Sequence, residues 1–257
     1  MFPIRDHNPS ATTPVVTWTL IALNVAIHVW VTASVQTTAQ LYRLYDAYAM
    51  IPAEISAGQG WQTLVTSTFL HGGWMHLGGN MLFLWIFGDN LEEALGRLGF
   101  LLFYLVCGVG AGLGQWAAGP ASPVPTIGAS GAIAGVMGGY LLLFPRAKVD
   151  ILLFLVVIIR IIPVPAWIML LLWFGLQVVN GATADPVTGD VAYWAHAGGF
   201  IIGFVLMVPA FVRRGAAAFW RRTDGHPPHP DAQWGPLTPS RVPAVRRPRR
   251  EPGRRGR

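Results

Sequence analysis

Six long apolar stretches constrain this chain more than any other feature of its sequence. A helix needs about 20 mostly apolar residues to cross the hydrocarbon core of a bilayer. On that measure the sequence predicts membrane-spanning helices at residues 15–36, 74–93, 98–118, 127–145, 165–181 and 190–212. Only 12% of the 257 residues are charged, about half the share of an average soluble domain. We therefore expect an all-α polytopic membrane protein, a six-helix bundle with a long first loop at residues 37–73.

Polar segments at both ends divide the chain into three parts. Residues 1–14 form a short N-terminal segment, residues 15–212 the membrane domain, and residues 213–257 a tail. The tail holds eight prolines, with 12 Lys and Arg against 3 Asp and Glu, so we expect it to be basic and disordered. Residues 1–212 carry 6 basic and 9 acidic residues, so nucleic-acid binding by the body of the protein is not indicated.

Basic residues at the span ends predict the topology. Arg97, Arg146, Lys148, Arg213 and Arg214 follow the second, fourth and sixth spans, which end on one side of the membrane. The positive-inside rule makes that side the cytoplasm. We expect a multi-pass protein of the plasma membrane with both termini in the cytoplasm, where the tail can also bind anionic lipid headgroups.

A short apolar segment at residues 149–163 interrupts this regular pattern. It is rich in β-branched residues and contains Arg160. We expect it to lie at the cytoplasmic interface with Arg160 extended towards water. A seventh span is the alternative.

Polar residues inside spans are costly in lipid, so each is a candidate for function. His76 and Asn80 are one helical turn apart, early in the second span. Ser130 lies early in the fourth span and His196 early in the sixth. Because these three spans begin on the same, outer side, the four side chains are expected to lie at a similar depth.

These four residue types suit nucleophilic catalysis. A serine hydroxyl becomes a strong nucleophile only when a neighbouring base takes its proton, and a neutral histidine can do so. Attack on a carbonyl creates an oxyanion, which needs hydrogen-bond donors. We expect Ser130 as nucleophile, His196 as base, and His76, Asn80 and the Ser130 backbone N–H as oxyanion donors.

Glycines suggest how the spans approach one another. Gly199 and Gly203 lie three and seven residues after His196, on nearly the same face of the sixth span. Gly131, beside Ser130, leaves the surface of the fourth span without a side chain at that position. Small residues let membrane helices pack closely. Gly128 stands two residues before the serine.

Each feature also has a simpler interpretation. Small residues are ordinary packing devices, and His76 with Asn80 is typical of an interhelical polar clamp. Asn24 and His28 are expected to form structural hydrogen bonds. Rim hydrogen bonds are expected for a further group: Gln115, Gln177 and Asn180.

A metal or haem protein using His28, His76 and His196 is a further alternative. The chain has no His-Glu-x-x-His motif, and its one cysteine, Cys107, rules out an intrachain disulfide and a metal site built on several thiolates. We expect no cofactor and no metal.

Three motifs resemble those of the rhomboid family of intramembrane serine proteases. They are Trp61-Gln62 through His71 to Asn80, continuing to Gly88 and Glu92; Gly128-Ala129-Ser130-Gly131-Ala132; and Ala195 to Gly199 with Gly203. The resemblance covers residues 15–212 and implies a bundle with a cavity open to the outer side. It implies a Ser130–His196 dyad without an aspartate, oxyanion roles for His76 and Asn80, and a structural role for Glu92.

Two residues depart from the family pattern. Gln62 follows Trp61 where members often have arginine, and Ala134 stands where many bacterial members place an aromatic residue that stacks on the histidine. We therefore expect that His196 is positioned by other means and that the space near Ser130 is larger.

The expected function is intramembrane endoproteolysis of transmembrane or membrane-anchored proteins through a Ser-His dyad and an acyl-enzyme. The partners are then transmembrane substrates and the bilayer. The alternative is a catalytically silent relative that binds transmembrane helices. The sequence does not indicate an oligomeric state.

Overall fold

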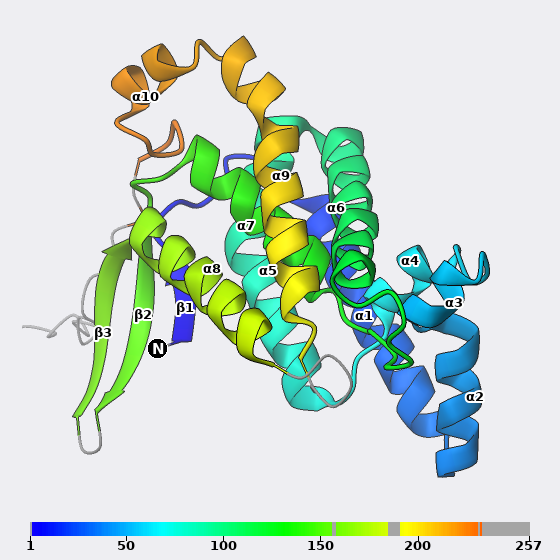
Figure 1. Ribbon diagram of the computed structural model, residues 1–257. Coiled ribbons are helices and arrows are strands. Elements are labelled where there is room, and N and C mark those ends of the chain that lie inside the picture. The colour runs from blue at the N-terminus through cyan, green and yellow to red at the C-terminus, as the bar shows by residue number, and fades with distance from the viewer. Residues whose placement is uncertain (1, 156–157, 185–190, 231, 233–257) are drawn as a thin grey trace, which may run out of the picture.

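Six long helices form the body of the protein (Figure 1). The computed structural model describes residues 2–155, 158–184, 191–230 and 232. The helices are α1 (Val15–Ser34), α5 (Trp74–Leu95), α6 (Arg97–Ala118), α7 (Ser130–Leu143), α8 (Ala166–Thr183) and α9 (Tyr193–Arg213). Each lies within a few residues of one expected span, so the prediction of an all-α polytopic membrane bundle is confirmed.

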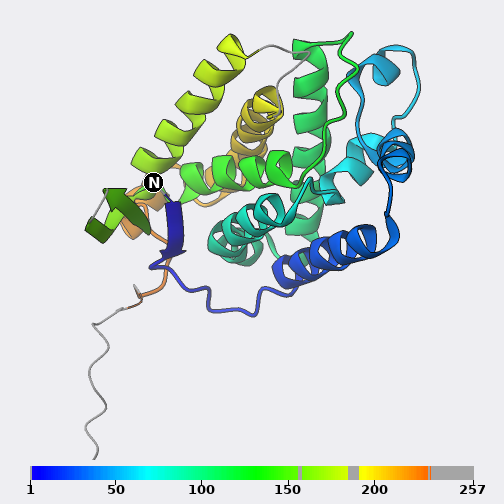
Figure 2. The same ribbon diagram turned by 90° about the horizontal axis from the view of Figure 1, so that it is seen from below.

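The helices differ in how they meet the lipid. By length and hydropathy alone, α1, α6, α8 and α9 can each cross a membrane. Helix α7 has only 14 residues, but all of them from Gly131 to Leu143 are buried. Figures 1 and 2 show α7 in the middle of the bundle, where other helices surround it. The helix that starts with Ser130 is therefore packed by protein over its length.

Helices α7 and α9 make the most extensive contact in the molecule. At Gly199 and Gly203 the backbone of α9 lies against the carbonyls of Gly131 and Gly135, so that an added Cβ would overlap those oxygens. Backbones can approach this closely only where side chains are absent. The expected packing role of Gly131, Gly199 and Gly203 is consistent with these contacts.

Replacing Gly203 by alanine is expected to separate α7 from α9 and to lower the free energy of unfolding by about 1–3 kcal/mol, the usual cost of overpacking. Thermal unfolding of the purified protein in detergent measures this. The control is Gly175→Ala in α8, because an added Cβ there meets nothing within 4 Å. Equal melting temperatures for the two variants would contradict the close approach.

The long first loop is itself helical and is tied to its surroundings. It contains α2 (Thr38–Tyr48), α3 (Pro52–Ser56), α4 (Thr63–Thr66) and a 3₁₀ turn, η1 (Ser67–Phe69). The Trp116 indole donates to Ser56 Oγ at 2.9 Å, and that hydroxyl donates to the carbonyl of Pro120 at 2.7 Å. Met50 and Thr126 form a β-bridge. These contacts anchor the loop through residues other than Gln62.

A three-stranded antiparallel sheet stands beside the bundle (Figure 1), and the sequence does not predict it. Its strands, in the order β1-β2-β3, are β1 (Phe2–Asp6), β2 (Lys148–Leu155) and β3 (Ile158–Pro165). The alternative of a seventh helical span over residues 149–163 is therefore wrong. The β-branched residues there favour strands, and Asp150 joins β2 to β1 through an ion pair with Arg5 at 2.7 Å.

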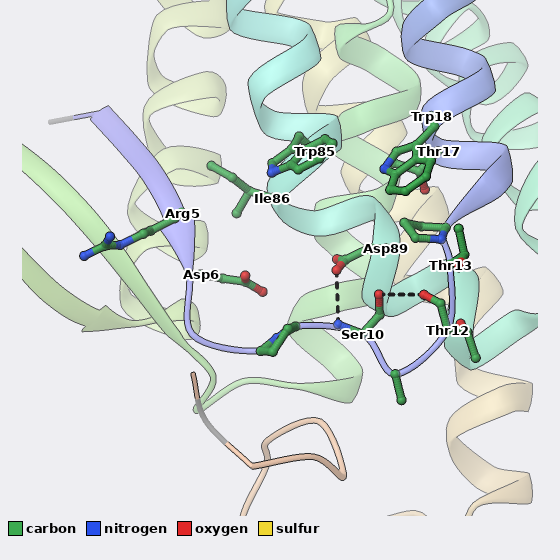
Figure 3. A pocket seen from close by; sticks show the side chains of 13 residues that line it. Arg5, Asp6, Ser10, Thr12, Thr13, Thr17, Trp18, Trp85, Ile86 and Asp89 are labelled. Atoms are coloured by element: carbon green, nitrogen blue, oxygen red, sulfur yellow. Dashed lines mark hydrogen bonds between the residues drawn. The ribbon is translucent and has the colours of Figure 1, made fainter. Parts of the chain in front are cut away.

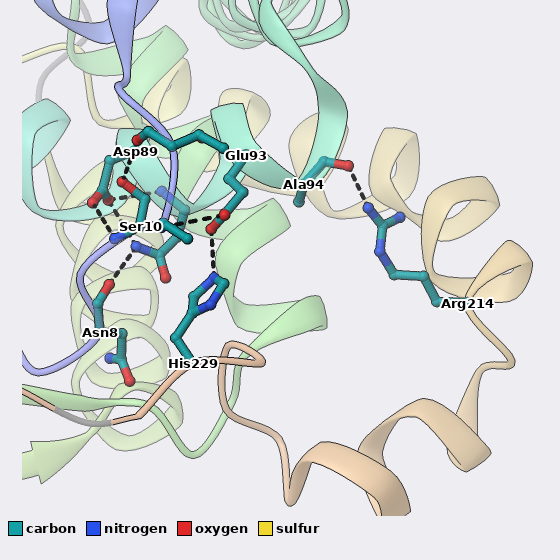
Figure 4. Close-up of polar contacts among 10 residues, drawn as sticks. Asn8, Ser10, Asp89, Glu93, Ala94, Arg214 and His229 are labelled. Carbon is teal, nitrogen blue, oxygen red and sulfur yellow. Dashed lines mark hydrogen bonds and ion pairs between the residues drawn. The ribbon is translucent and has the colours of Figure 1, made fainter.

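The last turns of α5 hold both terminal segments (Figure 4). Glu93 accepts hydrogen bonds from the backbone N–H of Ala11 and, at 2.6 Å, from His229 Nε2. Asp89 accepts from the N–H of Ser10. The Arg214 guanidinium donates to the carbonyl of Ala94.

Glu92 caps the first helix from a distance in the sequence. Its carboxylate accepts from the N–H groups of Val16 and Thr17, at 2.9 and 2.8 Å, and from the Thr17 hydroxyl. Pro14, the residue that precedes α1, offers no side-chain cap. A carboxylate at a helix N-terminus satisfies free N–H groups and opposes the helix dipole. The geometry fits the structural role expected for Glu92.

Part of the tail differs from expectation. Residues 213–230 are folded, with a short helix α10 (Ala217–Thr223). Phe219 is buried, and the Trp220 indole donates to the carbonyl of Leu142 at 3.0 Å. These two aromatic side chains anchor α10 against the end of α7, where Phe219 also contacts Phe144 with ring centroids 6.4 Å apart. For residues 231 and 233–257 the prediction of disorder falls outside the described residues.

A pocket of about 470 Å³ lies between the N-terminal segment, α1 and α5 (Figure 3). Asp6 and Asp89 line it from β1 and α5. Burial, and then the nearby carboxylate of Asp89, raise the pKa of Asp6 from its ordinary 3.8 to about 8. The Tyr140 hydroxyl donates to Asp6 at 3.4 Å. Asp6 therefore holds its proton at neutral pH in the folded protein.

This proton makes stability depend on pH. Between about pH 4 and pH 8 the folded chain binds the Asp6 proton and the unfolded chain has lost it, so stability decreases as pH rises through that range. Because asparagine does not titrate, the Asp6→Asn variant does not lose stability in this way as the pH rises. We expect its melting temperature relative to wild type to rise from pH 5 to pH 8. A difference that does not change with pH would contradict the buried proton.

Candidate functional site

Ser130 and His196 come together at the end of the bundle where α7 and α9 begin. Ser130 is the first residue of α7, and His196 lies in the first turn of α9. Ser130 Oγ and His196 Nε2 are 2.8 Å apart, a hydrogen-bond distance. The glycine contacts between the two helices bring these first turns close enough for the two side chains to meet.

A pocket of about 510 Å³ opens beside this pair. Ser130, His196 and His76 line it, together with Ile127, Met75 and Val191. The side chain of Met75 is 89% exposed, so this rim faces outward from the protein. A serine hydroxyl, a potential base and a second imidazole thus line one cavity.

The backbone of residue 72 orients the ring of His76. The N–H of Gly72 donates to His76 Nδ1 at 3.3 Å. A neutral imidazole whose Nδ1 accepts carries its hydrogen on Nε2. Nε2 is therefore the donor, and it lies 2.8 Å from the position where Gly128 would carry Cβ. Gly128 leaves that approach open, and its φ of +126° is one that other residues rarely adopt.

Asn80 lies one turn further along α5 and is 6% exposed. Within the part of the chain that the structure describes, its Nδ2 has no hydrogen-bond partner. A buried amide donor without a partner is costly unless something transient uses it. Asn80 therefore carries a free donor one turn from His76, although it does not line the pocket itself.

The other ring nitrogen of His196 meets a residue whose importance the sequence does not reveal. His196 Nδ1 lies 2.8 Å from Gln177 Oε1 on α8. The indole of Trp173, one turn earlier on α8, has its centroid 5.7 Å from that of His196. Gln177 is predicted only as a rim residue, and Trp173 is not singled out. Trp173 lies one helical turn before Gln177, a polar residue inside a span, and this spacing is the signal that could have identified Trp173.

The remaining polar candidates have structural contacts. Gln115 Oε1 accepts from the N–H of Ala195 at 3.1 Å and so caps the start of α9, whereas Asn180 is exposed. Asn24 donates to the carbonyl of Leu20 within its own helix. Asp190, the acidic residue nearest to His196 in the sequence, lies outside the described residues.

The histidines of the metal alternative do not form a ligand set. The hydrogen bonds expected of His28 are not present among the described residues, and its ring instead packs edge-on against Trp74, with ring centroids 4.7 Å apart. His71 lies between His28 and His76, with centroids 6.3 and 5.2 Å away. Over residues 2–155, 158–184, 191–230 and 232, no group of three or more His, Cys, Asp or Glu side chains has the arrangement of metal ligands.

The sequence is similar to those of known proteins. A family model described as Rhomboid domain matches residues 57–213. Rhomboid protein 1, mitochondrial, of Saccharomyces cerevisiae is 33% identical over 193 residues, which cover 72% of this chain and 50% of that protein. Rhomboid-like protein 11, chloroplastic, of Arabidopsis thaliana is 47% identical over 76 residues, 30% of this chain and 27% of that protein.

A bacterial relative carries an activity in its name. Rhomboid protease GluP of Bacillus subtilis is 42% identical over 87 residues, which cover 34% of this chain and 16% of that protein. The chain thus spans half or less of the length of the relatives named here.

Proposed function

Because this chain belongs to the rhomboid family, whose members are generally intramembrane serine proteases, we propose that it is an intramembrane serine endopeptidase. Its substrates are transmembrane or membrane-anchored proteins. The observation that carries the proposal is the 2.8 Å contact between Ser130 Oγ and His196 Nε2, made across two helices that begin at one end of the bundle.

The chemistry needs only this pair and water. His196 Nε2 takes the hydroxyl proton as Ser130 Oγ attacks the carbonyl carbon of the substrate, which forms a tetrahedral oxyanion. The imidazolium then gives that proton to the leaving amine, the C–N bond breaks, and an acyl-enzyme remains. Water, deprotonated by the same imidazole, attacks the ester and releases the acid and the free serine.

Three donors are available to the oxyanion. His76 Nε2 carries its hydrogen towards the pocket, since Nδ1 accepts from Gly72. Asn80 supplies the amide donor without a protein partner. The N–H of Ser130 belongs to the first turn of α7, where the helix dipole favours negative charge. Donors held by rigid helices in a site poor in water act strongly on a developing charge.

The substrate must present an extended segment. A carbonyl inside a helix is hydrogen-bonded and shielded, so a substrate helix has to unwind before Ser130 reaches it. We therefore expect small residues at the cut and helix-breaking residues near it.

The membrane and the orientation follow from the charge pattern. We propose that the chain is a plasma-membrane protein with both termini in the cytoplasm, because basic residues cluster at the ends of α5, α7 and α9. The pocket beside Ser130 then opens on the outer side. The yeast relative is named mitochondrial, so localisation of a tagged chain in its own cells is the direct check.

Labelling and cleavage together test the function. We expect a serine-directed fluorophosphonate to label wild type in reconstituted lipid, and the Ser130→Ala variant neither to be labelled nor to cleave a panel of transmembrane reporters. Circular dichroism and melting temperature check that the variant is folded. Cleavage that survives in folded Ser130→Ala would refute the mechanism. If wild type binds reporters but does not cut them, the silent helix-binding alternative holds.

The Asn80→Ala variant tests the oxyanion site. Loss of one such donor typically lowers kcat by about 100-fold or more, and we expect that result here with little change in KM. Kinetics of reporter cleavage in lipid measure it. Asn24→Ala is the matched control, because Asn24 is a buried amide on α1 that hydrogen-bonds within its own helix. An equal loss of activity in both variants would count against a donor role for Asn80.

A further inference from the structure

Helix α8 contacts His196 on the side away from Ser130, through Gln177 and Trp173. We propose that Gln177 and Trp173 of α8 are positioning residues for the Ser130–His196 pair, with Gln177 acting as the neutral third member of the array. The inference rests on the proposed function. It assigns to α8 the orienting role that an aspartate plays in a Ser-His-Asp triad.

The amide orientation of Gln177 is fixed by its own helix. Gln177 Nε2 donates to the carbonyl oxygen of Trp173 at 3.3 Å. Rotating the amide by 180° would set Oε1 against that carbonyl oxygen, two acceptors facing each other. The amide nitrogen therefore belongs at the Trp173 carbonyl, and Oε1 belongs at His196 Nδ1, 2.8 Å away.

This orientation decides the tautomer of His196. Oε1 can only accept, so the hydrogen of the neutral ring must lie on Nδ1. Nε2 then has a free lone pair, and it faces Ser130 Oγ at 2.8 Å. That is the form required of a general base. Without Gln177 the ring is free to take the other tautomer, which presents N–H to the serine and cannot accept its proton.

The same contact strengthens during the reaction. When His196 takes the serine proton, Nδ1–H becomes part of a cation, and hydrogen bonds from charged donors are about twice as strong as neutral ones. The Gln177 amide thus stabilises the imidazolium without placing a carboxylate in the membrane, where a charge is costly.

Trp173 restrains the plane of the same ring. Its indole lies 5.7 Å from the imidazole at 35° and also contacts Phe200 at 6.3 Å. Ala134, where many bacterial family members place an aromatic residue, is fully buried on α7 and leaves that side without a ring. An aromatic surface on α8 therefore packs against His196 in its place.

Helix α8 is a lightly packed part of the bundle. Its contacts are mainly with α9, and its buried residues are Ala166, Leu170, Gln177 and Gly181. Of these four residues only Gln177 has a polar side chain, and its two hydrogen bonds explain why that side chain can be buried. A displacement of α8 from α9 removes the amide and the indole from His196 together, so the competence of the pair depends on where α8 lies.

The Gln177→Met variant tests the role, since methionine keeps the length of the side chain and removes the acceptor. We expect kcat for reporter cleavage in lipid to decrease about tenfold to hundredfold, a fraction of what general-base catalysis contributes, with KM within about twofold of wild type. Fluorophosphonate labelling of Ser130 should slow by the same factor. Asn180→Leu is the control, because Asn180 is an exposed amide on the same helix.

The Gln177→Glu variant distinguishes positioning from simple packing. A carboxylate retains the acceptor and stabilises the imidazolium, so we expect most of the activity to return and the acidic half-maximum of the pH–rate profile to move to higher pH. Melting temperatures are measured for all variants. If Gln177→Met is unfolded, the pH profile of Gln177→Glu decides.

Wild-type kinetics in folded Gln177→Met, or an unmoved pH profile in Gln177→Glu, overturns the positioning role and leaves the proposed function intact. A wild type that neither cleaves reporters nor reacts with fluorophosphonate refutes the proposed function, and the role of α8 falls with it.

Discussion

The contact between the backbones of α7 and α9 is the interaction on which the rest of the structure depends. Two first turns, 66 residues apart in the chain, must present a hydroxyl and an imidazole to each other at 2.8 Å. Ordinary side chains at Gly199 and Gly203 would hold the helices apart, because their Cβ atoms would overlap carbonyl oxygens of α7. In lipid, where apolar surfaces gain little by leaving their solvent, such close packing supplies much of the association energy. The same glycines thus serve packing and the geometry of the site.

Several polar groups in the apolar bundle are placed so that they satisfy a neighbour. Gln115 caps α9, Gly72 orients His76, and Gln177 joins His196 to α8. Unpaired polar groups in a membrane interior cost several kcal/mol each, roughly, so these contacts limit which arrangements of the helices are stable. Among the described residues, the buried atoms without a partner include Asn80 Nδ2 and the ring nitrogens of His28 and His71, and we propose that a reaction intermediate uses the Asn80 donor.

The sequence predicted the features that follow from the length of its apolar stretches and from the helical spacing of its polar residues. Apolar runs gave the six helices to within a few residues, and polar residues inside spans indicated Ser130, His196, His76 and Asn80. What depends on tertiary contacts was not predictable. The three-stranded sheet needs β1 to pair with a segment some 150 residues away, which no local pattern reveals. In the sequence, Gln177 cannot be distinguished from any other amide at the end of a span. Its role depends on the direction in which α8 points its side chain, which is a tertiary feature. The folding of α10 depends on the tertiary contacts of Phe219 and Trp220 with the rest of the protein.

The capping of α1 by Glu92 has a consequence for how the protein is made. Helix α1 leaves the ribosome before α5, yet the carboxylate that satisfies the first N–H groups of α1 belongs to the end of α5, more than 70 residues later. Until α5 has entered the bilayer, the start of α1 must rely on water or headgroups for those bonds. The start of α1 therefore gains these three hydrogen bonds only after α5 has been made.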